Sequence, residues 1–400
     1  MPVVLLVREN ISVEMACGAV VESDQEGKAM TKYTWEDLMR FQSEPLDDKI
    51  QRSIAKIGEW YLWCKNQCYV SFSGGKDSTV LADLCAQWSK AIDQPLHLVF
   101  VDTGLEYPEI KCHVVDFAEW LRKQYGIDVD MQIVRPKMRF DEVIRRYGYP
   151  MISKEISQIV YEARRTIRNG NPATYRVDKI LGRAVDKNGN KSRFNIEKYS
   201  PLLKTDFIVG SNCCNVMKKS PAHKFEKTSG FSPITGQMAE ESRLRAQSWL
   251  KNGCNAFEAK RQISNPLSFW TEQDVLEYIQ RYGVPISSVY GDIVFADDPD
   301  QIRIEGSCGK LCTTGCQRTG CIFCGFGAHL ERGETRFQRL ARTHPKQYAY
   351  CIGGGEYNES GMWVPSKKGL GMGHVFDELN MIYGDDFIRY KPEKEQPNEK

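Results

Sequence analysis

A short hexapeptide carries the clearest chemical signal in this chain. The segment SGGKDS (residues 73–78) follows the apolar run CYVSF and precedes a run of helical character. Two adjacent glycines permit a tight turn whose N–H groups approach a phosphate, and the N-terminus of the following helix adds partial positive charge. Lys76 offers a cation, while Asp77 would repel phosphate unless Mg²⁺ bridges the two. The segment therefore predicts a site for a magnesium–pyrophosphate group, formed by Ser73, Gly74, Gly75, Lys76, Asp77 and Ser78.

The spacing of this hexapeptide differs from that of a P-loop, in which four residues separate the first glycine from Gly-Lys-Ser/Thr. Ordinary transfer of a γ-phosphate is therefore not implied. The competing interpretation is a glycine-rich turn on the protein surface without function. A strand, a turn and a helix in this order favour the phosphate site.

Cysteine is the second residue type whose distribution indicates chemistry. The chain has 14 cysteines. Cys213 and Cys214 are adjacent, and Cys321 and Cys324 form a Cys-x-x-Cys turn that can present two sulfurs to one metal group. In a large chain without an export signal, such clustering indicates metal or redox chemistry rather than disulfides. Structural zinc uses the same turn. Cys308, Cys312 and Cys316 could form a separate metal site, or they could replace members of this set as ligands.

Charge is distributed unevenly along the chain. The formal net charge is only +2, yet residues 135–204 hold 17 Lys or Arg against 7 Asp or Glu. Tyr161, Tyr175 and Phe194 are interleaved with these cations. Basic side chains beside aromatic rings are typical of surfaces that follow a nucleic-acid backbone. The alternatives are a solvated, charged insertion and a funnel for a small anionic substrate.

The elements that position these residues follow from the hydrophobic pattern. Buried strands are expected at residues 68–72, 96–102, 129–134 and 232–236, with helices between them. Strands that alternate with helices predict βαβ units and a doubly wound, mainly parallel α/β sheet. Within the basic stretch, residues 154–168 favour a helix. The Asn188-Gly189 turn and its flanking residues predict a β-hairpin. Thr271 is the expected N-cap of a helix that ends near Gly283.

Four regions are expected along the chain. Residues 1–66 form an N-terminal helical segment, and residues 67–285 form the α/β domain with a basic insertion at about 154–204. Residues 286–390 form a cysteine-rich module, and residues 391–400 form a disordered tail. No apolar run approaches the length of a membrane helix, about 20 residues. The opening residues do not suit a signal peptide, so a cytoplasmic location without membrane association is expected.

Several of these segments together resemble a known family. SGGKDS is similar to the pyrophosphate loop of the PP-loop ATP pyrophosphatases. FVDTGLEYPE, ITGQMAEESRLR and NPLSFWTEQDVLEYI resemble three segments of the phosphoadenosine-phosphosulfate (PAPS) reductase family, in the same order. The resemblance covers about residues 67–283. It implies a doubly wound fold that binds an adenine nucleotide, with ATP and Mg²⁺ as the expected cofactors.

The resemblance also implies roles for particular residues. Asp102 and Thr103, at the end of a strand, are expected near the nucleotide. Lys76, Asp77 and Asp102 are the expected catalytic residues. The far side of the pocket is expected to contain Gly236, Glu241, Ser242, Arg243 and Arg245. The alternative for residues 241–245 is a solvated helix face with local ion pairs.

The cysteines add a second resemblance. Cys213, Cys214, Cys321 and Cys324 are similar to the Cys-Cys…Cys-x-x-Cys set that holds a [4Fe–4S] cluster in the adenylylsulfate reductases. A cluster is therefore expected at these four residues, with Zn²⁺ as the alternative.

The chain departs from the reductases in two ways. Their C-terminal Glu-Cys-Gly motif with its catalytic cysteine has no counterpart, because the last cysteine of this chain is Cys351 in YCIGGG. Met238 also stands at a position where the family has arginine.

Three functions follow as hypotheses. The first is an ATP pyrophosphatase that adenylates an acceptor and completes a sulfur transfer, with tRNA or DNA as the modified partner. The second is a reductase of a sulfonucleotide such as PAPS. The third is a non-catalytic module that binds nucleic acid. No motif identifies the acceptor, the sulfur donor, a redox partner or the oligomeric state.

Overall fold

The computed structural model describes residues 31–170, 174–296 and 309–392. The chain forms two units, each assembled from separate stretches of sequence. Unit 1 contains Met1–Asp102, Tyr107–Val134 and Ala222–Thr319, and unit 2 contains Thr103–Glu106, Arg135–Pro221 and Gly320–Lys400. Some of the sequence-based predictions fall on residues outside the described ones: residues 1–30 of the N-terminal segment, 171–173 of the basic insertion, 297–308 of the cysteine-rich module with Cys308, and 393–400 of the tail.

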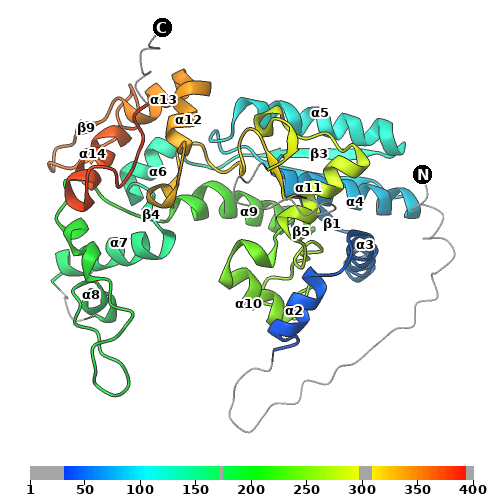
Figure 1. The fold of residues 1–400 in the computed structure, drawn as a ribbon, viewed down its shortest axis with the longest axis horizontal. Coiled ribbons are helices and arrows are strands. Elements are labelled where there is room, and N and C mark those ends of the chain that lie inside the picture. The colour runs from blue at the N-terminus through cyan, green and yellow to red at the C-terminus, as the bar shows by residue number, and fades with distance from the viewer. Residues whose placement is uncertain (1–30, 171–173, 297–308, 393–400) are drawn as a thin grey trace. The chain divides into compact units, whose positions relative to one another are not determined.

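A parallel sheet of four strands forms the centre of unit 1 (Figure 1). Its strands lie in the order β3 (Val129–Val134), β2 (Leu96–Val101), β1 (Cys68–Ser71) and β5 (Ser232–Ile234). All three pairings are parallel. The central strands β1 and β2 are mostly buried and apolar, as expected for a parallel sheet whose faces are covered by helices. The structure confirms the predicted α/β fold with a doubly wound, mainly parallel sheet.

The strand order fixes where a ligand is expected to bind. The chain places β2 and β3 on one side of β1 and then returns to place β5 on the other side. The order reverses between β1 and β5, and ligands of open α/β sheets bind at such a switch point, beyond the carboxyl ends of the strands. The hexapeptide 73–78 follows β1, and Gly236 follows β5.

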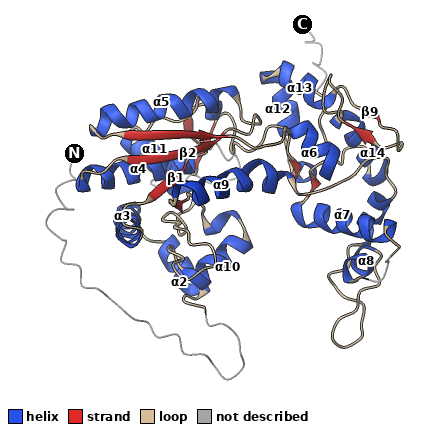
Figure 2. Cartoon of the chain, turned by 180° about the vertical axis from the view of Figure 1, so that it is seen from behind, coloured by secondary structure: helices blue, strands red, loops and turns tan. Residues whose placement is uncertain are grey.

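Helices connect and cover the strands of unit 1 (Figure 2). α4 (Lys76–Ile92) links β1 to β2, and α5 (Pro108–Tyr125) links β2 to β3 and packs beside α4. α3 (Leu46–Trp63) and α11 (Glu272–Tyr282) also pack against α4. A buried ion pair joins these two helices, with Lys49 Nζ 2.7 Å from Asp274 Oδ2. The remaining elements of unit 1 are α2 (Trp35–Gln42), η3 (Ala239–Glu241), α10 (Arg243–Asn252), η4 (Ser288–Tyr290), β6 (Ile293–Phe295) and β7 (Leu311–Thr313).

Unit 2 is mainly helical and has two short two-stranded sheets within its described residues. β4 (Met151–Ile152) pairs in parallel with β8 (Gly325–Phe326), and β9 (Glu356–Tyr357) pairs antiparallel with β10 (Trp363–Val364). Its helices are α6 (Phe140–Tyr147), α7 (Lys154–Arg168), α8 (Tyr175–Ile180), η1 (Glu197–Leu203), the π-helical η2 (Asn215–Lys219), η5 (Ala328–Leu330), α12 (Arg336–Thr343), α13 (Pro345–Ile352) and α14 (Met372–Tyr383). η2 continues into α9 (Ser220–Ser229), which crosses the boundary of the two units.

Two helix predictions are confirmed and the hairpin prediction is wrong. α7 occupies the predicted residues 154–168, and α11 has a Thr271–Asp274 capping box and ends at Gly283. The segment before the Asn188-Gly189 turn is the helix α8, because Thr174 caps it and Val177 and Ile180 bury one face. The turn itself is present, with Gly189 at φ +81°. A single antiparallel bridge, Val185 to Lys191, flanks it in place of two strands.

The helices of the described residues also bear on membrane association. None of them combines the length and the apolar character that a membrane span requires.

Candidate functional site

The hexapeptide 73–78 forms a tight loop between β1 and α4. Gly74 has φ +72°, in the left-handed region that favours glycine. A Cβ atom at this position would lie 2.8 Å from Ile110 Cγ2 and 2.9 Å from Val114 Cγ2, both on α5. Helix α4 then begins at Lys76. The loop therefore has the strand–turn–helix geometry that its sequence predicted, and Gly74 satisfies both a backbone and a packing requirement.

The hydroxyl groups of the loop stabilise the turn itself. The N–H of Ser73 donates to Ser78 Oγ at 3.1 Å, and Ser78 Oγ donates to the carbonyl of Gly75 at 2.9 Å. The two hydroxyl oxygens are 3.0 Å apart. The first-turn N–H groups of a helix have no acceptor within the helix. In α4 the N–H of Lys76 donates to Tyr290 Oη at 3.1 Å. The turn is thus held in place by its own side chains and by Tyr290.

Lys76 is buried, with only 3% of its surface exposed. Its ammonium group lies 2.9 Å from Glu272 Oε1 at the start of α11 and donates to the carbonyl of Gln317 at 2.9 Å. Asp77 Oδ1 is further away, at 3.9 Å from Lys76 Nζ. A buried ammonium needs such partners because desolvation of an unpaired charge is costly.

The Asp77 carboxyl group lacks a hydrogen bond on one oxygen. Among the described residues, Asp77 Oδ1 is buried without a hydrogen-bond partner. Burial raises the pKa of this carboxyl, and the charge of Glu272 raises it further. The opposing charges belong to Lys76, Arg318 and Arg245. A buried carboxylate oxygen without a hydrogen bond, among cations, fits a site that would hold Mg²⁺ together with a phosphate group.

Gly236 and the segment that follows it flank the loop on the β5 side. A Cβ atom at Gly236 would lie 3.1 Å from the carbonyl oxygen of Asp77 and 3.3 Å from the N–H nitrogen of Ser78. Arg245 forms an ion pair with Glu241, and its charge also acts on Asp77. Gly236 therefore lies against the backbone of the phosphate loop, and the charge of Arg245 acts on its Asp77.

Two other predicted residues of this segment have different positions. Ser242 is the N-cap of α10, and its hydroxyl accepts a hydrogen bond from the N–H of Arg245. Arg243 is exposed on the first turn of that helix. The ion pair between Glu241 and Arg245 is the kind of local contact expected if residues 241–245 form a solvated helix face instead of a wall of the nucleotide pocket.

The predicted pair Asp102 and Thr103 lies on the boundary of the two units. Asp102 follows β2 in unit 1 and accepts a hydrogen bond from Lys111 Nζ at 2.7 Å. Because β2 is parallel to β1, Asp102 and the phosphate loop share the carboxyl edge of the sheet. Thr103 belongs to unit 2, where its hydroxyl donates to Glu106 at 2.6 Å.

Sequence reasoning missed a group of residues that contacts the loop. Tyr290 Oη lies 2.6 Å from Thr319 Oγ1 and accepts from the N–H of Lys76, while Gln317 accepts from the Lys76 ammonium group. Burial raises the pKa of Tyr290 to about 12, so its hydroxyl is protonated at neutral pH. These residues come from the segment after residue 286, where the sequence has no local motif that marks Tyr290, Gln317 or Thr319 as partners of the loop.

The four predicted metal ligands all belong to unit 2. Cys213 and Cys214 stand directly before η2, and Cys321 and Cys324 form a turn in which the N–H of Cys324 donates to the carbonyl of Cys321 at 3.0 Å. Electrostatic effects link the thiols, since the charges of Cys214 and Cys324 raise the pKa of Cys321 and those of Cys321 and Cys324 raise that of Cys213. The structure thus brings the two cysteine pairs into one region of unit 2.

Positive charges surround this cysteine group. A hydrogen bond from Cys213 lowers the pKa of Cys214 to about 6, and Lys154, Lys218 and Lys219 add to the effect. Burial raises the pKa of Cys321 to about 11, against the charge of Lys218. Four thiols among cations fit the donor set and the negative charge of a four-thiolate cluster. Among the described residues, no group of three or more His, Cys, Asp or Glu is arranged to hold a single metal ion. Cys312 and Cys316 belong to unit 1.

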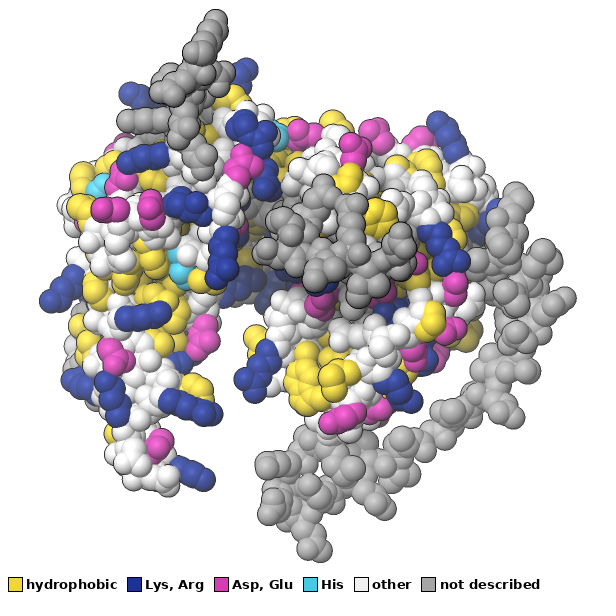
Figure 3. Space-filling model, in the orientation of Figure 1, with side chains coloured by type: hydrophobic (Ala, Val, Ile, Leu, Met, Phe, Trp, Pro, Cys, Tyr) yellow, Lys and Arg dark blue, Asp and Glu magenta, His cyan; other side chains and the backbone are white. Residues whose placement is uncertain are grey.

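The basic stretch divides into paired and exposed cations. Arg164 donates to the carbonyls of Thr205 and Phe207, and Arg145 donates to that of Pro365. Ion pairs also join Arg176 to Glu162, Lys179 to Glu155, and Lys191 to Glu197. Tyr175 and Phe194 are 59% and 56% exposed. The exposed cations of this stretch include Arg165, Arg168, Lys187 and Arg193, and the guanidinium of Arg193 lies 4.9 Å from the centre of the Phe194 ring. In Figure 3, the part of unit 2 that α7 and α8 form shows Lys and Arg side chains with acidic ones among them.

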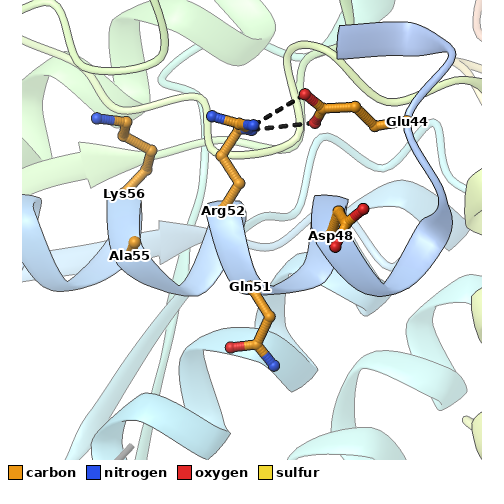
Figure 4. A pocket seen from close by; sticks show the side chains of 6 residues that line it. All are labelled: Glu44, Asp48, Gln51, Arg52, Ala55 and Lys56. Atoms are coloured by element: carbon orange, nitrogen blue, oxygen red, sulfur yellow. Dashed lines mark hydrogen bonds and ion pairs between the residues drawn. The ribbon is translucent and has the colours of Figure 1, made fainter. Parts of the chain in front are cut away.

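A surface depression on α3 contains none of the predicted site residues. Glu44, Asp48, Gln51, Arg52, Ala55 and Lys56 line it, and the guanidinium of Arg52 pairs with Glu44 at 2.8 Å (Figure 4). Its polar groups come from successive turns of one helix and the residues before it, so it resembles an ordinary solvated helix face.

Comparisons with known proteins agree with the geometry of the sheet and loop. The family model of the phosphoadenosine phosphosulfate reductase domain matches residues 67–169 and 160–325. Two uncharacterised proteins of Methanocaldococcus jannaschii are also similar. MJ0973 is 34% identical over 118 residues, which cover 29% of this chain and 26% of the relative. MJ0066 is 36% identical over 116 residues, which cover 28% of this chain and 22% of the relative. The similarity thus spans about a quarter of the length of these curated relatives.

Proposed function

Because the chain belongs to the phosphoadenosine phosphosulfate reductase domain family, we propose that it is an ATP-dependent adenylating enzyme of the ATP pyrophosphatase type that acts in sulfur transfer. One observation carries this proposal. The phosphate loop retains both Lys76 and Asp77, and Asp77 Oδ1 is buried without a hydrogen-bond partner among the described residues. A loop of this kind suits the magnesium–pyrophosphate end of ATP.

The proposed reaction has two steps. An oxygen atom of the acceptor attacks the α-phosphorus of ATP, the bond from this phosphorus to the bridging oxygen breaks, and pyrophosphate leaves. A sulfur nucleophile of the sulfide class then attacks the acceptor atom that carries the adenylated oxygen, the bond from that atom to the oxygen breaks, and AMP leaves with the oxygen. Both leaving groups are anions, so cations that neutralise them lower the barrier.

The loop residues divide this work between them. Lys76 and Arg245 neutralise the charge that develops on the leaving pyrophosphate, and the first-turn N–H groups of α4 orient its oxygens. Asp77 would hold Mg²⁺, which supplies further charge neutralisation when bound. Asp102 lies at the same sheet edge and is proposed to orient the nucleotide or the acceptor.

The cysteine group is proposed to hold a [4Fe–4S] cluster through Cys213, Cys214, Cys321 and Cys324. Their spacing, their thiol donors and the surrounding cations support this assignment. Zinc is the alternative, because the Cys-x-x-Cys turn also serves structural zinc sites.

The family match supports a second candidate, a reductase of PAPS or a related sulfonucleotide. Such a reductase needs an accessible thiol as nucleophile. The last cysteine, Cys351, is completely buried, and burial raises its pKa. A buried, protonated thiol is a poor nucleophile. Cys351 is therefore a poor candidate for this nucleophile, and we rank the reductase second.

An anaerobic assay separates the two candidates. Purified protein is incubated with MgATP and either tRNA or DNA, and pyrophosphate is measured. Pyrophosphate release that depends on the acceptor and is lost in Lys76→Ala supports adenylation. Sulfite release from PAPS with a dithiol reductant, without pyrophosphate release from ATP, would overturn the proposal in favour of the reductase.

A further inference from the structure

The Lys76 ammonium group has an acidic partner that does not belong to the phosphate loop. Glu272, the first residue of α11, lies 2.9 Å from Lys76 Nζ. Its side chain is 36% exposed, whereas that of Lys76 is 4% exposed. The buried cation is therefore neutralised by a carboxylate that can move into solvent.

The segment 317–319 forms the second contact with this cation. Gln317 accepts from Lys76 Nζ at 2.9 Å, and Thr319 Oγ1 lies 2.6 Å from the Tyr290 hydroxyl that accepts from the N–H of Lys76. A Cβ atom at Gly75 would lie 3.4 Å from Thr319 Oγ1. Arg318 stands between these two anchored residues, is exposed, and its charge acts on Asp77. The residues on both sides of Arg318 are thus anchored beside the loop, while the Arg318 side chain is exposed.

From this geometry we infer that Glu272 takes the place of a phosphate group on Lys76 until a nucleotide binds, and that Arg318 is a further phosphate-binding residue. The inference rests on the proposed function, since it concerns the same phosphate loop. A phosphate group carries more charge than a carboxylate and displaces Glu272, which turns toward solvent. Arg318 then donates to phosphate oxygens, because a guanidinium pairs with phosphate through two hydrogen bonds.

The two residues affect binding in opposite directions. Glu272 competes with phosphate for Lys76, so removal of its charge strengthens binding. Arg318 attracts phosphate, so removal of its side chain weakens binding. A substitution that merely loosened the site would weaken binding in both cases.

Isothermal titration calorimetry of the full chain with MgATP, and separately with magnesium pyrophosphate, tests both statements. Glu272→Gln is expected to bind both ligands about fivefold more tightly, the effect of one partly exposed ion pair. Arg318→Ala is expected to bind them about tenfold more weakly. Arg318→Lys keeps the charge and is expected to recover part of the loss. The matched controls are Glu277→Gln, exposed on the same helix, and Arg332→Ala, exposed in unit 2, and both are expected to bind like the unaltered protein.

The outcomes separate this inference from the proposed function. If the unaltered protein binds neither MgATP nor magnesium pyrophosphate, the proposed function and this inference both fail. If it binds them, and Glu272→Gln binds no more tightly or Arg318→Ala no more weakly, the inference alone is overturned. Thermal melting of each variant verifies that the affinities refer to folded protein.

Discussion

Asp77 has opposite effects on stability and on the proposed chemistry. Burial raises the pKa of its carboxyl, so the folded protein disfavours the ionised form. The same ionised form is the one that would hold Mg²⁺ beside a phosphate. Residues that destabilise the fold while serving a ligand are common at functional sites.

This conflict gives a prediction for Asp77→Asn in metal-free buffer. The destabilising effect of the carboxylate is absent below its usual pKa and fully present once the pH exceeds the raised pKa. At pH 7 the variant is therefore expected to melt at a higher temperature than the unaltered protein, and near pH 4 the difference is expected to shrink. Its pyrophosphate release is expected to fall about 100-fold or more.

Scanning calorimetry at both pH values measures the first effect, and the pyrophosphate assay measures the second. The exposed Asp128→Asn is the matched control. A lower melting temperature for Asp77→Asn at pH 7 would contradict the stated role of burial.

The sequence identified the loop residues because their signal is local. SGGKDS lies between a strand and a helix, so its turn geometry depends on its nearest neighbours. Tyr290, Gln317 and Thr319 could not be identified in the same way. Tyr290 and Gln317 contact Lys76 and Thr319 contacts Tyr290, all through tertiary contacts, and no periodic pattern marks the segment that contains them.

At the scale of elements, the contact between the phosphate loop and α5 makes Gly74 irreplaceable. Gly74→Ala adds a methyl group within 3 Å of Ile110 and Val114 at a positive φ. The variant is expected to lose about 1–3 kcal/mol or more of unfolding free energy and most of its affinity for MgATP. Gly126→Ala is the matched control, because Gly126 has a similar φ of +65° and no atom within 4 Å of the added carbon. Equal destabilisation of the two variants in urea denaturation would remove the packing argument.

The two cysteine elements of unit 2 give a compositional prediction. Anaerobically purified protein is expected to be brown and to contain about four iron atoms per chain, as for a cubane cluster. Cys214→Ser and Cys321→Ser are each expected to remove most of this iron, whereas Cys112→Ser, exposed on α5, is expected to retain it. Metal analysis and visible absorption measure the result. One equivalent of zinc without visible absorption would establish the alternative metal.

Errors in the element predictions have identifiable causes. The hairpin was predicted from alternation near Asn188, but one turn of helix with Val177 and Ile180 on its buried face has a similar pattern over so few residues. Helices α12, α13 and α14 were not predicted at all. The Thr335–Gln338 capping box was present in the sequence as a signal for α12.

At the scale of the whole molecule, the exposed cations of the basic stretch are the proposed contact for tRNA or DNA. Arg164 is unsuitable as a test residue, because it holds the carbonyls of Thr205 and Phe207. The triple variant Arg165→Ala, Arg168→Ala and Arg193→Ala is expected to bind nucleic acid more weakly. The slope of the logarithm of its binding constant against the logarithm of the salt concentration is expected to become shallower by about three at most. MgATP affinity is expected to be unchanged.

Fluorescence anisotropy over a salt series measures this effect. The control triple variant replaces Lys90, Lys251 and Arg332, which are exposed elsewhere. If the two triple variants behave alike, the basic stretch is a solvated insertion, and the acceptor is better sought among small molecules.

The interleaved course of the chain has a consequence for its biosynthesis. β1 pairs with β5, in a register that places Cys68 opposite Ser232, so the sheet cannot form completely until Ser232 has been synthesised. Likewise, the ion pair of Lys49 requires Asp274, and the contacts of the phosphate loop require Gln317 and Thr319, which are synthesised much later. Pairings so distant in sequence form slowly, because a long loop must close first. Unit 1 therefore cannot be completed on the ribosome until about half of unit 2 has also been made. A nascent chain arrested before residue 232 would expose the edge of β1, and such a chain is expected to depend on chaperones.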